Sequence, residues 1–295
     1  FSDYHEAIEY IREQKFPIVV KADGLALGKG VLICNRLKDA ENAVYDMMVA
    51  ERFGKAGNTI VVEEFIEDVE MSILAFCDGK TIKPMVSSQD YKRVFDGDKG
   101  LNTGGMGAFS PTPAYSKEVS EKVYKEIIVP TMNAMNSENR EFKGVLYFGL
   151  IMNDEGIKVL EYNARFGDPE TQVVLPLLES DLFDVMQAVV DGKLDEIDIK
   201  WKKKAAVCVI LTSGGYPLEY QNGYKINIGE VEEDIILYHA GTKIKDGDLR
   251  TAGGRVLGIT AVKDSIEQSR EAVYRNIKKI GFEGMHYRKD IGIIE

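Results

Sequence analysis

"KADGLALGKGVLI", residues 21 to 33, places three glycines between two apolar segments. Such a turn can hold phosphate, because glycine lets backbone N–H groups approach an anion closely. A Walker loop needs four residues between its glycines and a Ser or Thr after Gly-Lys. Here three residues separate Gly24 from Gly28, and Gly30 follows Lys29. A Rossmann loop leads into a helix, but Gly30 leads into a strand-like apolar run. Neither familiar loop fits.

A third kind of loop matches the pattern better. "PIVVKA" (17–22) and "VLIC" (31–34) have the composition of β-strands, so the loop joins two strands and could fold over a triphosphate as a lid. Lys21 at the end of the first strand and Lys29 on the loop would add positive charge. From the loop alone, a plain β-hairpin with a flexible tip is an equal alternative.

The composition is that of a globular protein of about two domains. The 295 residues are 44% hydrophobic and 29% charged, with a net charge of −11, which disfavours nucleic acid as a partner. Each of the three cysteines lies in an apolar run, so we expect buried, reduced thiols and a cytoplasmic protein. No apolar run approaches the roughly 20 residues that cross a bilayer, so we expect no membrane partner. The chain begins on Phe1 inside a helical pattern, and we expect an N-terminal part to be missing.

Apolar periodicity predicts alternating helices and strands up to about residue 191. Residues 90–116 are rich in Gly, Asp and Pro and have little periodicity, which is typical of a functional or disordered loop. The predicted strands are 17–22, 31–34, 59–66, 71–77 and a pair around "NDEG" (144–152 and 157–164), and the predicted helices are 3–14, 38–51, 117–136 and 170–191. A polar stretch then precedes a new apolar strand, which indicates a domain boundary near residue 192.

Three further stretches carry a specific resemblance. They are "VVEEFIEDVE" (61–70), "SSQDYKRVFDGDKGLNTGGMGAFSP" (87–111) and "LEYNARFGDPETQ" (160–172). With the C-terminal pieces "TSGGYP", "HAGT", "TAGGRVLGITA" and "YRKDIG", the chain resembles the glycinamide ribonucleotide synthetases, a family of ATP-grasp ligases, from about residue 7 to 292.

The resemblance implies an α+β fold. Residues 1–191 would form the ATP-grasp domain, with a small subdomain (about 1–67) and a large one (about 68–191) that clamp ATP. Residues 192–295 would form a small C-terminal α/β domain. The family's N-terminal domain, about 100 residues on the ordinary scale of one domain, would be absent.

The sequence departs from the family pattern at a few positions. Leu27 stands where Ala is expected, Tyr91 where His is expected, Leu101 in place of Pro and Phe109 in place of Tyr. Tyr91 matters most, because it lies between candidate substrate ligands. The ending "IGIIE" also differs from the usual one.

The family's reaction joins glycine to 5-phosphoribosylamine while ATP is cleaved to ADP and phosphate. It passes through glycyl phosphate and needs Mg²⁺ (or Mn²⁺) to neutralise the triphosphate. Two alternatives stay open: an ATP-grasp ligase with another acid or amine, such as a formate- or bicarbonate-using purine enzyme, or a non-catalytic nucleotide-binding module. We expect a monomer.

Glu161 and Asn163 fit the metal role, since residues two apart on a strand face the same side and Mg²⁺ prefers oxygen ligands. The alternative is a surface Glu and a turn-forming Asn. Arg165, on the same face if the strand continues, could clamp the γ-phosphoryl or acyl-phosphate group bidentately. An ion pair between Arg165 and Asp168 is a second interpretation, and both could hold.

The nucleotide would be held by two segments. By resemblance, Glu63, Glu64 and Phe65 lie beside adenine and Glu70 accepts the ribose hydroxyls, although such an acidic run is more often a solvated surface. The phosphates would contact the opening loop: Lys21, Asp23, Gly24, Gly28, Lys29 and Gly30.

Substrate binding is expected in residues 89–107. Asp90 could bind the glycine ammonium, and Lys92 could meet phosphate; with Arg165 they are our candidate catalytic residues. The remaining candidate substrate ligands are Arg93, Asn102, Thr103, Gly104, Gly105, Met106 and Asp168. We predict no catalytic histidine, because His5, His239 and His286 lie far from these motifs in sequence.

Overall fold

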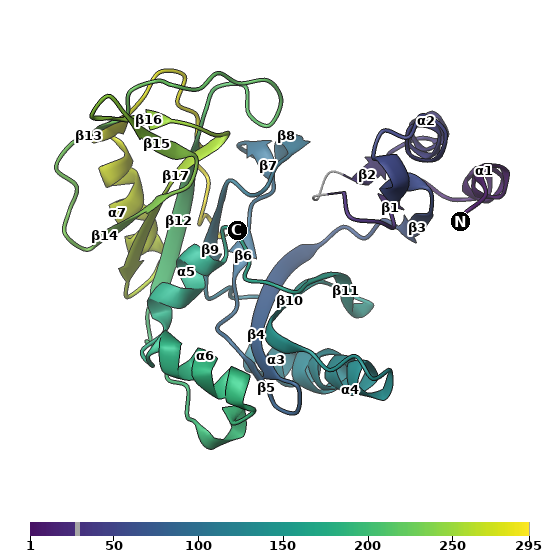
Figure 1. Cartoon of the computed structure of the whole chain (residues 1–295), viewed down its shortest axis with the longest axis horizontal. Helices are drawn as coiled ribbons and strands as arrows, with labels where there is room; N and C mark the ends of the chain where they lie inside the picture. The colour runs from purple at the N-terminus through teal and green to yellow at the C-terminus, as the bar shows by residue number, and fades with distance from the viewer. Residues whose placement is uncertain (27–29, 295) are drawn as a thin grey trace. The chain divides into compact units, whose positions relative to one another are not determined.

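The computed structural model describes residues 1–26 and 30–294 (Figure 1). It divides into two compact units, Phe1–Asp68 and Val69–Glu295. In these described residues, no helix has the length and apolar character needed to cross a membrane. All three cysteines are free and buried, as the apolar runs around them predicted.

The first unit packs two helices against a three-stranded antiparallel sheet. The helices are α1 (Tyr4–Arg12) and α2 (Leu37–Met48), and the strand order is β2-β1-β3. The sheet's strands are β1 (Ile18–Ala22), β2 (Val31–Cys34) and β3 (Ile60–Glu64), and a short 3-10 turn, η1 (Gly54–Gly57), precedes β3. β1 pairs antiparallel with β2, so the prediction that the opening loop joins two neighbouring strands is confirmed.

In the second unit, a four-stranded sheet is covered on both faces. Its order is β11-β10-β4-β5. Along β4 (Val69–Asp78), Ile73, Ala75 and Cys77 pack into one hydrophobic cluster, while Leu74 and Phe76 pack into another. Successive strand residues point to opposite faces, so a continuous apolar run marks a strand that is buried on both sides. The other strands are β5 (Ile82–Pro84), β10 (Lys143–Asn153) and β11 (Gly156–Asn163).

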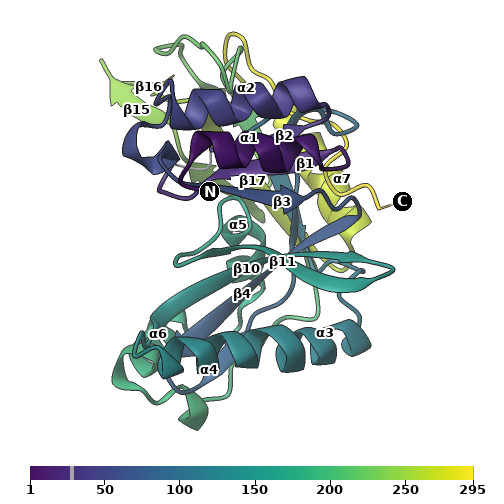
Figure 2. The same cartoon turned by 90° about the vertical axis from the view of Figure 1, so that its right-hand side faces the viewer.

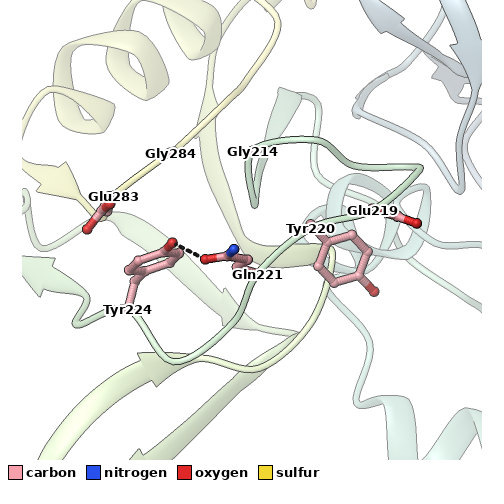
Figure 3. A pocket seen from close by; sticks show the side chains of 7 residues that line it. All are labelled: Gly214, Glu219, Tyr220, Gln221, Tyr224, Glu283 and Gly284. Atoms are coloured by element: carbon pink, nitrogen blue, oxygen red, sulfur yellow. Dashed lines mark hydrogen bonds between the residues drawn. The ribbon is translucent and has the colours of Figure 1, made fainter.

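Helices cover the first of these faces. α3 (Lys117–Val123), the π-helical turn η2 (Tyr124–Ile128) and α4 (Val129–Ser137) follow one another as a single helical run beside the sheet (Figure 2). Val123 and Ile128 pack there against β4. The predicted helix 117–136 is confirmed, and so is the predicted strand pair around "NDEG".

A five-stranded sheet with order β14-β17-β12-β9-β6 forms the rest of the second core. Its central strand β12 (Ala205–Thr212) is buried throughout: Val207, Val209 and Leu211 join one cluster, and Ala206 and Cys208 join the other. α7 (Ile266–Ile277) packs in the first cluster, and α5 (Thr171–Val174) and α6 (Leu182–Asp191) pack in the second. The other strands are β6 (Gln89–Asp90), β9 (Gly107–Ser110), β14 (Ile235–His239) and β17 (Arg255–Lys263).

Two expectations were wrong. Residues 90–116 are not without secondary structure, because β6, β7 (Arg93–Phe95), β8 (Lys99–Asn102) and β9 all fall there or at its edge. Strands this short have no visible period, and one of the two partners of β9, β12, lies about a hundred residues later. The predicted helix 170–191 is interrupted by the 3-10 turn η3 (Leu175–Leu177), since Pro176 cannot continue a helix.

The five-stranded sheet spans the boundary expected near residue 192, because β6 and β9 precede it and β12 follows it. The division into an ATP-grasp domain and a C-terminal domain therefore stays our proposal. The short elements that complete the unit are η4 (Leu194–Glu196), β13 (Asn227–Ile228), β15 (Thr242–Lys245), β16 (Asp248–Thr251) and β18 (Ile280–Gly281).

Candidate active site

A lysine among carboxylates marks the candidate site in the second unit. Lys92 follows β6, and its Nζ lies 2.5 Å from Oε2 of Glu70 on β4. Burial alone would lower the pKa of Lys92, but the carboxylates of Asp90, Glu70 and Glu161 outweigh it and raise that pKa. Lys92 is therefore a fixed cation at neutral pH, as a phosphate ligand must be.

Asp90 differs from an ordinary surface carboxylate. Its pKa is raised to about 7, chiefly by burial; Lys92 lowers it, and the charges of Glu170 and Glu70 add to the rise. A carboxyl group that titrates near neutral pH in a polar cluster is a recurrent feature of functional sites. The structure thus brings together Asp90, Lys92 and Glu70, three candidate residues that the sequence analysis assigned to different ligands.

Glu170, which the sequence interpretation did not single out, is a buried carboxylate whose charge acts on Asp90. It is 4% exposed and precedes α5. The Ser72 hydroxyl donates to Glu170 Oε1 at 3.4 Å and shares a 2.8 Å hydrogen bond with the Tyr147 hydroxyl. Burial raises the pKa of Glu170. The stretch "GDPETQ" did contain this second carboxylate, but only the fold buries it beside Asp90.

The candidate metal ligands lie side by side at the end of β11. Asn163 Nδ2 donates to Glu161 Oε1 at 3.4 Å, and Arg165 Nη2 donates to Asn163 Oδ1 at 3.4 Å. The described residues contain no group of three or more His, Cys, Asp or Glu that could hold a metal ion. One carboxylate and one amide fit a divalent cation that takes its remaining ligands from phosphates and water.

Gly149 on β10 creates the space for Glu161. It pairs directly with Glu161 across the two strands. A Cβ atom at position 149 would lie 2.9 Å from Glu161 Cγ and 3.4 Å from Tyr147 Cε1. Because glycine has no side chain, position 149 leaves room for the Glu161 side chain in its observed conformation.

Asp168 pairs with a cation that the sequence interpretation missed. Arg255 at the start of β17 donates from Nη2 to Asp168 Oδ2 at 2.7 Å and from Nη1 to Oδ1 at 3.2 Å. Arg165 instead donates to Asn163 and to the Phe166 carbonyl. The alternative of an Arg165–Asp168 ion pair is thus wrong in this structure. The stretch "TAGGRV" contains this Arg directly after two glycines, but nothing in the sequence pairs it with Asp168.

Arg255 also binds the backbone of Gly104, which lies with Gly105 in residues 89–107, where substrate binding is expected. Its Nη1 donates to the Gly104 carbonyl at 2.7 Å, and the Tyr216 hydroxyl accepts from Gly104 N at 3.0 Å. Gly105 has φ +107° and lies against Pro169, where a Cβ would approach Cδ to 2.4 Å. Residue 105 must therefore be glycine for both conformational and steric reasons.

Thr103 ties the same segment to Lys92. Its hydroxyl donates to the Lys92 carbonyl at 2.8 Å and accepts from Gly105 N at 3.0 Å. Arg93 donates to the Gly100 carbonyl within the β7–β8 hairpin, and Asn102 is exposed on β8. Met106 is fully buried, so its side chain belongs to the core. Their assignment as substrate ligands stays a prediction.

The first unit holds the opening loop. Lys21 Nζ lies 2.5 Å from Glu63 Oε2, while Glu64 ends β3 and Phe65 follows it. Gly24 packs so tightly on η1 that a Cβ would lie 2.5 Å from Ala56 Cα, and a Cβ on Gly30 would lie 2.7 Å from that of Ala26. Asp23 N donates to the Thr59 carbonyl. The remaining candidate ligands, Gly28 and Lys29, lie outside the described residues, as does Leu27.

The histidines contact groups outside this cluster. His5 follows the N-cap Asp3 of α1, His239 Nδ1 lies 3.2 Å from the Thr242 hydroxyl, and His286 Nε2 lies 2.8 Å from the Val94 carbonyl. The prediction of no catalytic imidazole is consistent with these positions and stays a prediction.

The fold and its site define an ATP-grasp protein. Solved structures with the same fold include a biotin carboxylase from Campylobacter jejuni, with a TM-score of 0.73 at 12% identity over 96% of this chain and 61% of that one, a likeness of fold alone. Family models described as the phosphoribosylglycinamide synthetase ATP-grasp (A) domain and C domain match residues 1–171 and 206–293. The chain belongs to the phosphoribosylglycinamide synthetase family.

Individual relatives agree with this assignment. A phosphoribosylamine–glycine ligase of Caldanaerobacter subterraneus is 47% identical over 99% of this chain and 70% of its own length. The crystal structure of a phosphoribosylamine–glycine ligase from Thermotoga maritima superposes with a TM-score of 0.87 at 33% identity, covering 97% of this chain and 72% of that one. The resemblance drawn from the motifs is confirmed.

Proposed function

We propose that this chain ligates glycine to 5-phosphoribosylamine at the expense of ATP, giving glycinamide ribonucleotide, ADP and phosphate in purine biosynthesis. The observation that carries the proposal is the 47% identity with a phosphoribosylamine–glycine ligase over 99% of the chain. The cluster of Lys92, Asp90, Glu70 and Glu161 supports it, because it provides a fixed cation and carboxylates of different character.

ATP would be held at named positions. Glu63, Glu64 and Phe65 would lie beside adenine, and Glu70 would accept the ribose hydroxyls. Glu70 now binds the Lys92 ammonium, so nucleotide binding would require the two groups to share or exchange partners. The opening loop, with Lys21, Asp23, Gly24, Gly28, Lys29 and Gly30, would contact the phosphates.

Glu161 and Asn163 would hold Mg²⁺ or Mn²⁺. A divalent cation supplies charge neutralisation on the triphosphate. Arg165, whose guanidinium already reaches Asn163, would bind the γ-phosphoryl group as its charge develops. Lys92 would add a second fixed positive charge there.

The chemistry has two balanced steps. A glycine carboxylate oxygen attacks the γ-phosphorus, the bond to the bridging oxygen breaks, and ADP leaves. The amine of phosphoribosylamine then attacks the acyl carbon, phosphate leaves, and the nitrogen loses one proton. Ionised Asp90 would hold the glycine ammonium, while Thr103, Gly104, Gly105 and Asp168 would line the substrate segment.

ADP release tests the proposal. With ATP and a divalent cation, release should depend on glycine and phosphoribosylamine together, and formate, bicarbonate or other amino acids should not replace glycine. No stimulation by that pair would overturn the proposal. Release driven by another acid would favour a different ATP-grasp ligase, and nucleotide binding without turnover would favour a non-catalytic module. A gel-filtration run would test our expectation of a monomer, and the three free cysteines favour the cytoplasm.

A further inference from the structure

We infer that the C-terminal segment, residues 286–293, positions Asp90 and Lys92 for the reaction, with Tyr91 and Arg288 as its positioning residues. The inference rests on the proposed function. These two residues do not touch substrate. They hold the backbone of residues 90–92 on the side opposite the candidate ligands Asp90 and Lys92.

The Tyr91 side chain, between β6 and β7, packs away from the candidate site. Asp90 and Lys92 face the carboxylate cluster, whereas the Tyr91 ring packs against the core cluster beside Phe109, with ring centroids 6.1 Å apart. The backbone is fixed as well: Tyr91 N donates to Gly107 O and its carbonyl accepts from Met106 N. A movement of the Tyr91 side chain would therefore be passed to both neighbours.

The Tyr91 hydroxyl binds the C-terminal segment in two ways. It accepts from Gly292 N at 3.1 Å and donates to the Ile293 carbonyl at 3.3 Å. Two departures from the family pattern, Tyr91 and the ending "IGIIE", are thus in direct contact. A phenol at this position provides both the donor and the acceptor that this ending needs.

Arg288 continues the contact with a buried guanidinium. It is 1% exposed and stacks on the Tyr91 ring, with Cζ 4.7 Å from the centroid. Nη1 donates to Asp98 Oδ1 at 2.6 Å and to the Arg93 carbonyl at 3.1 Å. Nε and Nη2 donate to the Asp290 carboxylate at 2.8 and 2.6 Å. The planar guanidinium thus makes four hydrogen bonds, to two carboxylates and one backbone carbonyl, whereas an ammonium has three donors.

Three further hydrogen bonds join the C-terminal segment to residues 94–97. His286 Nε2 lies 2.8 Å from the Val94 carbonyl. Lys289 N donates to Asp96 Oδ1 at 2.7 Å, and Gly97 N donates to Asp290 Oδ2 at 2.8 Å. The segment therefore holds the strand and hairpin from residue 91 to 98. The Lys92 carbonyl lies within this stretch and accepts both the N–H and the hydroxyl of Thr103.

The test compares two tyrosines whose hydroxyls both contact the C-terminal segment. Tyr91→Phe removes the hydroxyl that reaches Gly292 and Ile293 and keeps the ring on Arg288. Tyr274→Phe is the matched control: its hydroxyl donates to the Arg288 carbonyl at 2.8 Å and accepts from Ile291 N at 3.2 Å, but it comes from α7. Both variants remove two hydrogen bonds from the C-terminal segment, so their thermal stabilities should fall similarly.

The two variants should differ in kinetics. Since each lost hydrogen bond is worth about 0.5–1.5 kcal/mol, Tyr91→Phe should raise the KM for glycine about threefold to tenfold and leave kcat at saturating glycine within about twofold. Tyr274→Phe should leave both constants within about twofold. Arg288→Lys should raise the glycine KM as well. The rise should be larger than for Asp98→Asn, because lysine cannot make all the hydrogen bonds of the guanidinium.

Hydrogen exchange gives a readout that does not need turnover. Tyr91→Phe should speed exchange at the amides of Thr103, Gly105 and Met106, and Tyr274→Phe should not. Equal effects of the two variants, or a wild-type KM and wild-type exchange in Tyr91→Phe, would overturn the inference. A wild-type protein without glycine-dependent turnover would instead overturn the proposed function, and the exchange data would still decide the inference.

Discussion

Arg255 and Asp168 form a two-pronged ion pair between the start of β17 and the loop that precedes α5. Their atoms Nη2 and Oδ2 are 2.7 Å apart, and Nη1 and Oδ1 are 3.2 Å apart. Because Nη1 also donates to the Gly104 carbonyl, one guanidinium fixes two loops that carry candidate substrate ligands. A residue from the C-terminal part of the chain thereby takes part in the site.

Replacing Arg255 with Lys should damage catalysis more than stability. Lysine keeps the charge but cannot reach both Asp168 oxygens and Gly104 together. Charge-assisted hydrogen bonds are worth about 1.5–3 kcal/mol, so kcat/KM for phosphoribosylamine should fall by about 10- to 100-fold. Initial rates of ADP release with varied phosphoribosylamine would measure this fall.

Arg275→Lys is the matched control for that experiment. Arg275 makes a similar two-pronged pair with Glu232 at 2.8 and 2.9 Å, on the surface of α7. Its kcat/KM should stay within about twofold of wild type. If Arg255→Lys behaves like Arg275→Lys, the Arg255–Asp168 pair does not support catalysis.

Glu161→Gln should abolish metal-dependent turnover. The change keeps the shape of the side chain and its contact with Asn163 but removes the charge that a divalent cation requires. Turnover at saturating Mg²⁺ should fall by at least about 100-fold, and Mn²⁺ should not restore it. Exposed Glu155, in the turn between β10 and β11, is the control: Glu155→Gln should keep wild-type turnover. Equal turnover in the two variants would remove Glu161 from the metal site.

Local patterns predicted much of the fold but little of what surrounds the ligands. The strands on both sides of the opening loop and the β10–β11 pair are close in sequence, so turn residues and apolar alternation were sufficient to predict them. The place of β9 was not predictable, because its partner β12 lies about a hundred residues later. Pairings at such separations leave no local period in either strand.

The candidate site shows the same division. Glu161 and Asn163 could be chosen because strand geometry puts residues two apart on one face. Arg255 and Glu170 could not be chosen from the sequence, because each interacts with a partner on another element. The raised pKa of Asp90 likewise results from burial and from the charges of Glu170 and Glu70, which lie on two other segments.

Gly149→Ala should weaken metal activation without unfolding the protein. The new Cβ would lie 2.9 Å from Glu161 Cγ, closer than real Cβ contacts come, so the Glu161 side chain would have to move. Changes next to a metal ligand typically cost 10- to 100-fold in metal affinity, so the Mg²⁺ concentration for half-maximal turnover should rise about tenfold. Gly281→Ala is the control, because a Cβ there meets nothing within 4 Å. An unchanged Mg²⁺ requirement in Gly149→Ala would show that Glu161 does not depend on this space.

Asp90 should control the pH dependence of glycine use. Its pKa is raised to about 7, chiefly by burial, so the charged form that would bind the glycine ammonium is reached only as the pH rises through that value. For one group of pKa about 7, kcat/KM for glycine should increase about tenfold between pH 6 and pH 8. The raised pKa also means that the folded state binds this proton more tightly than the unfolded state does. The contribution of Asp90 to stability is therefore present at low pH and is lost as the pH rises from about 4 to about 7.

Glu170→Gln tests the origin of this dependence. Its charge raises the pKa of Asp90, so its removal should move the inflection of the kcat/KM profile to lower pH. The Ser72 hydroxyl can still donate to the amide oxygen of Gln, so the fold should be retained. Glu179→Gln, at an exposed position before α6, should leave the inflection in place. The substrates titrate in the same way with every variant. A difference between the kcat/KM profiles of two variants therefore comes from a group of the protein. An inflection that stays fixed in Glu170→Gln, or that persists in Asp90→Asn, would show that another group controls glycine use.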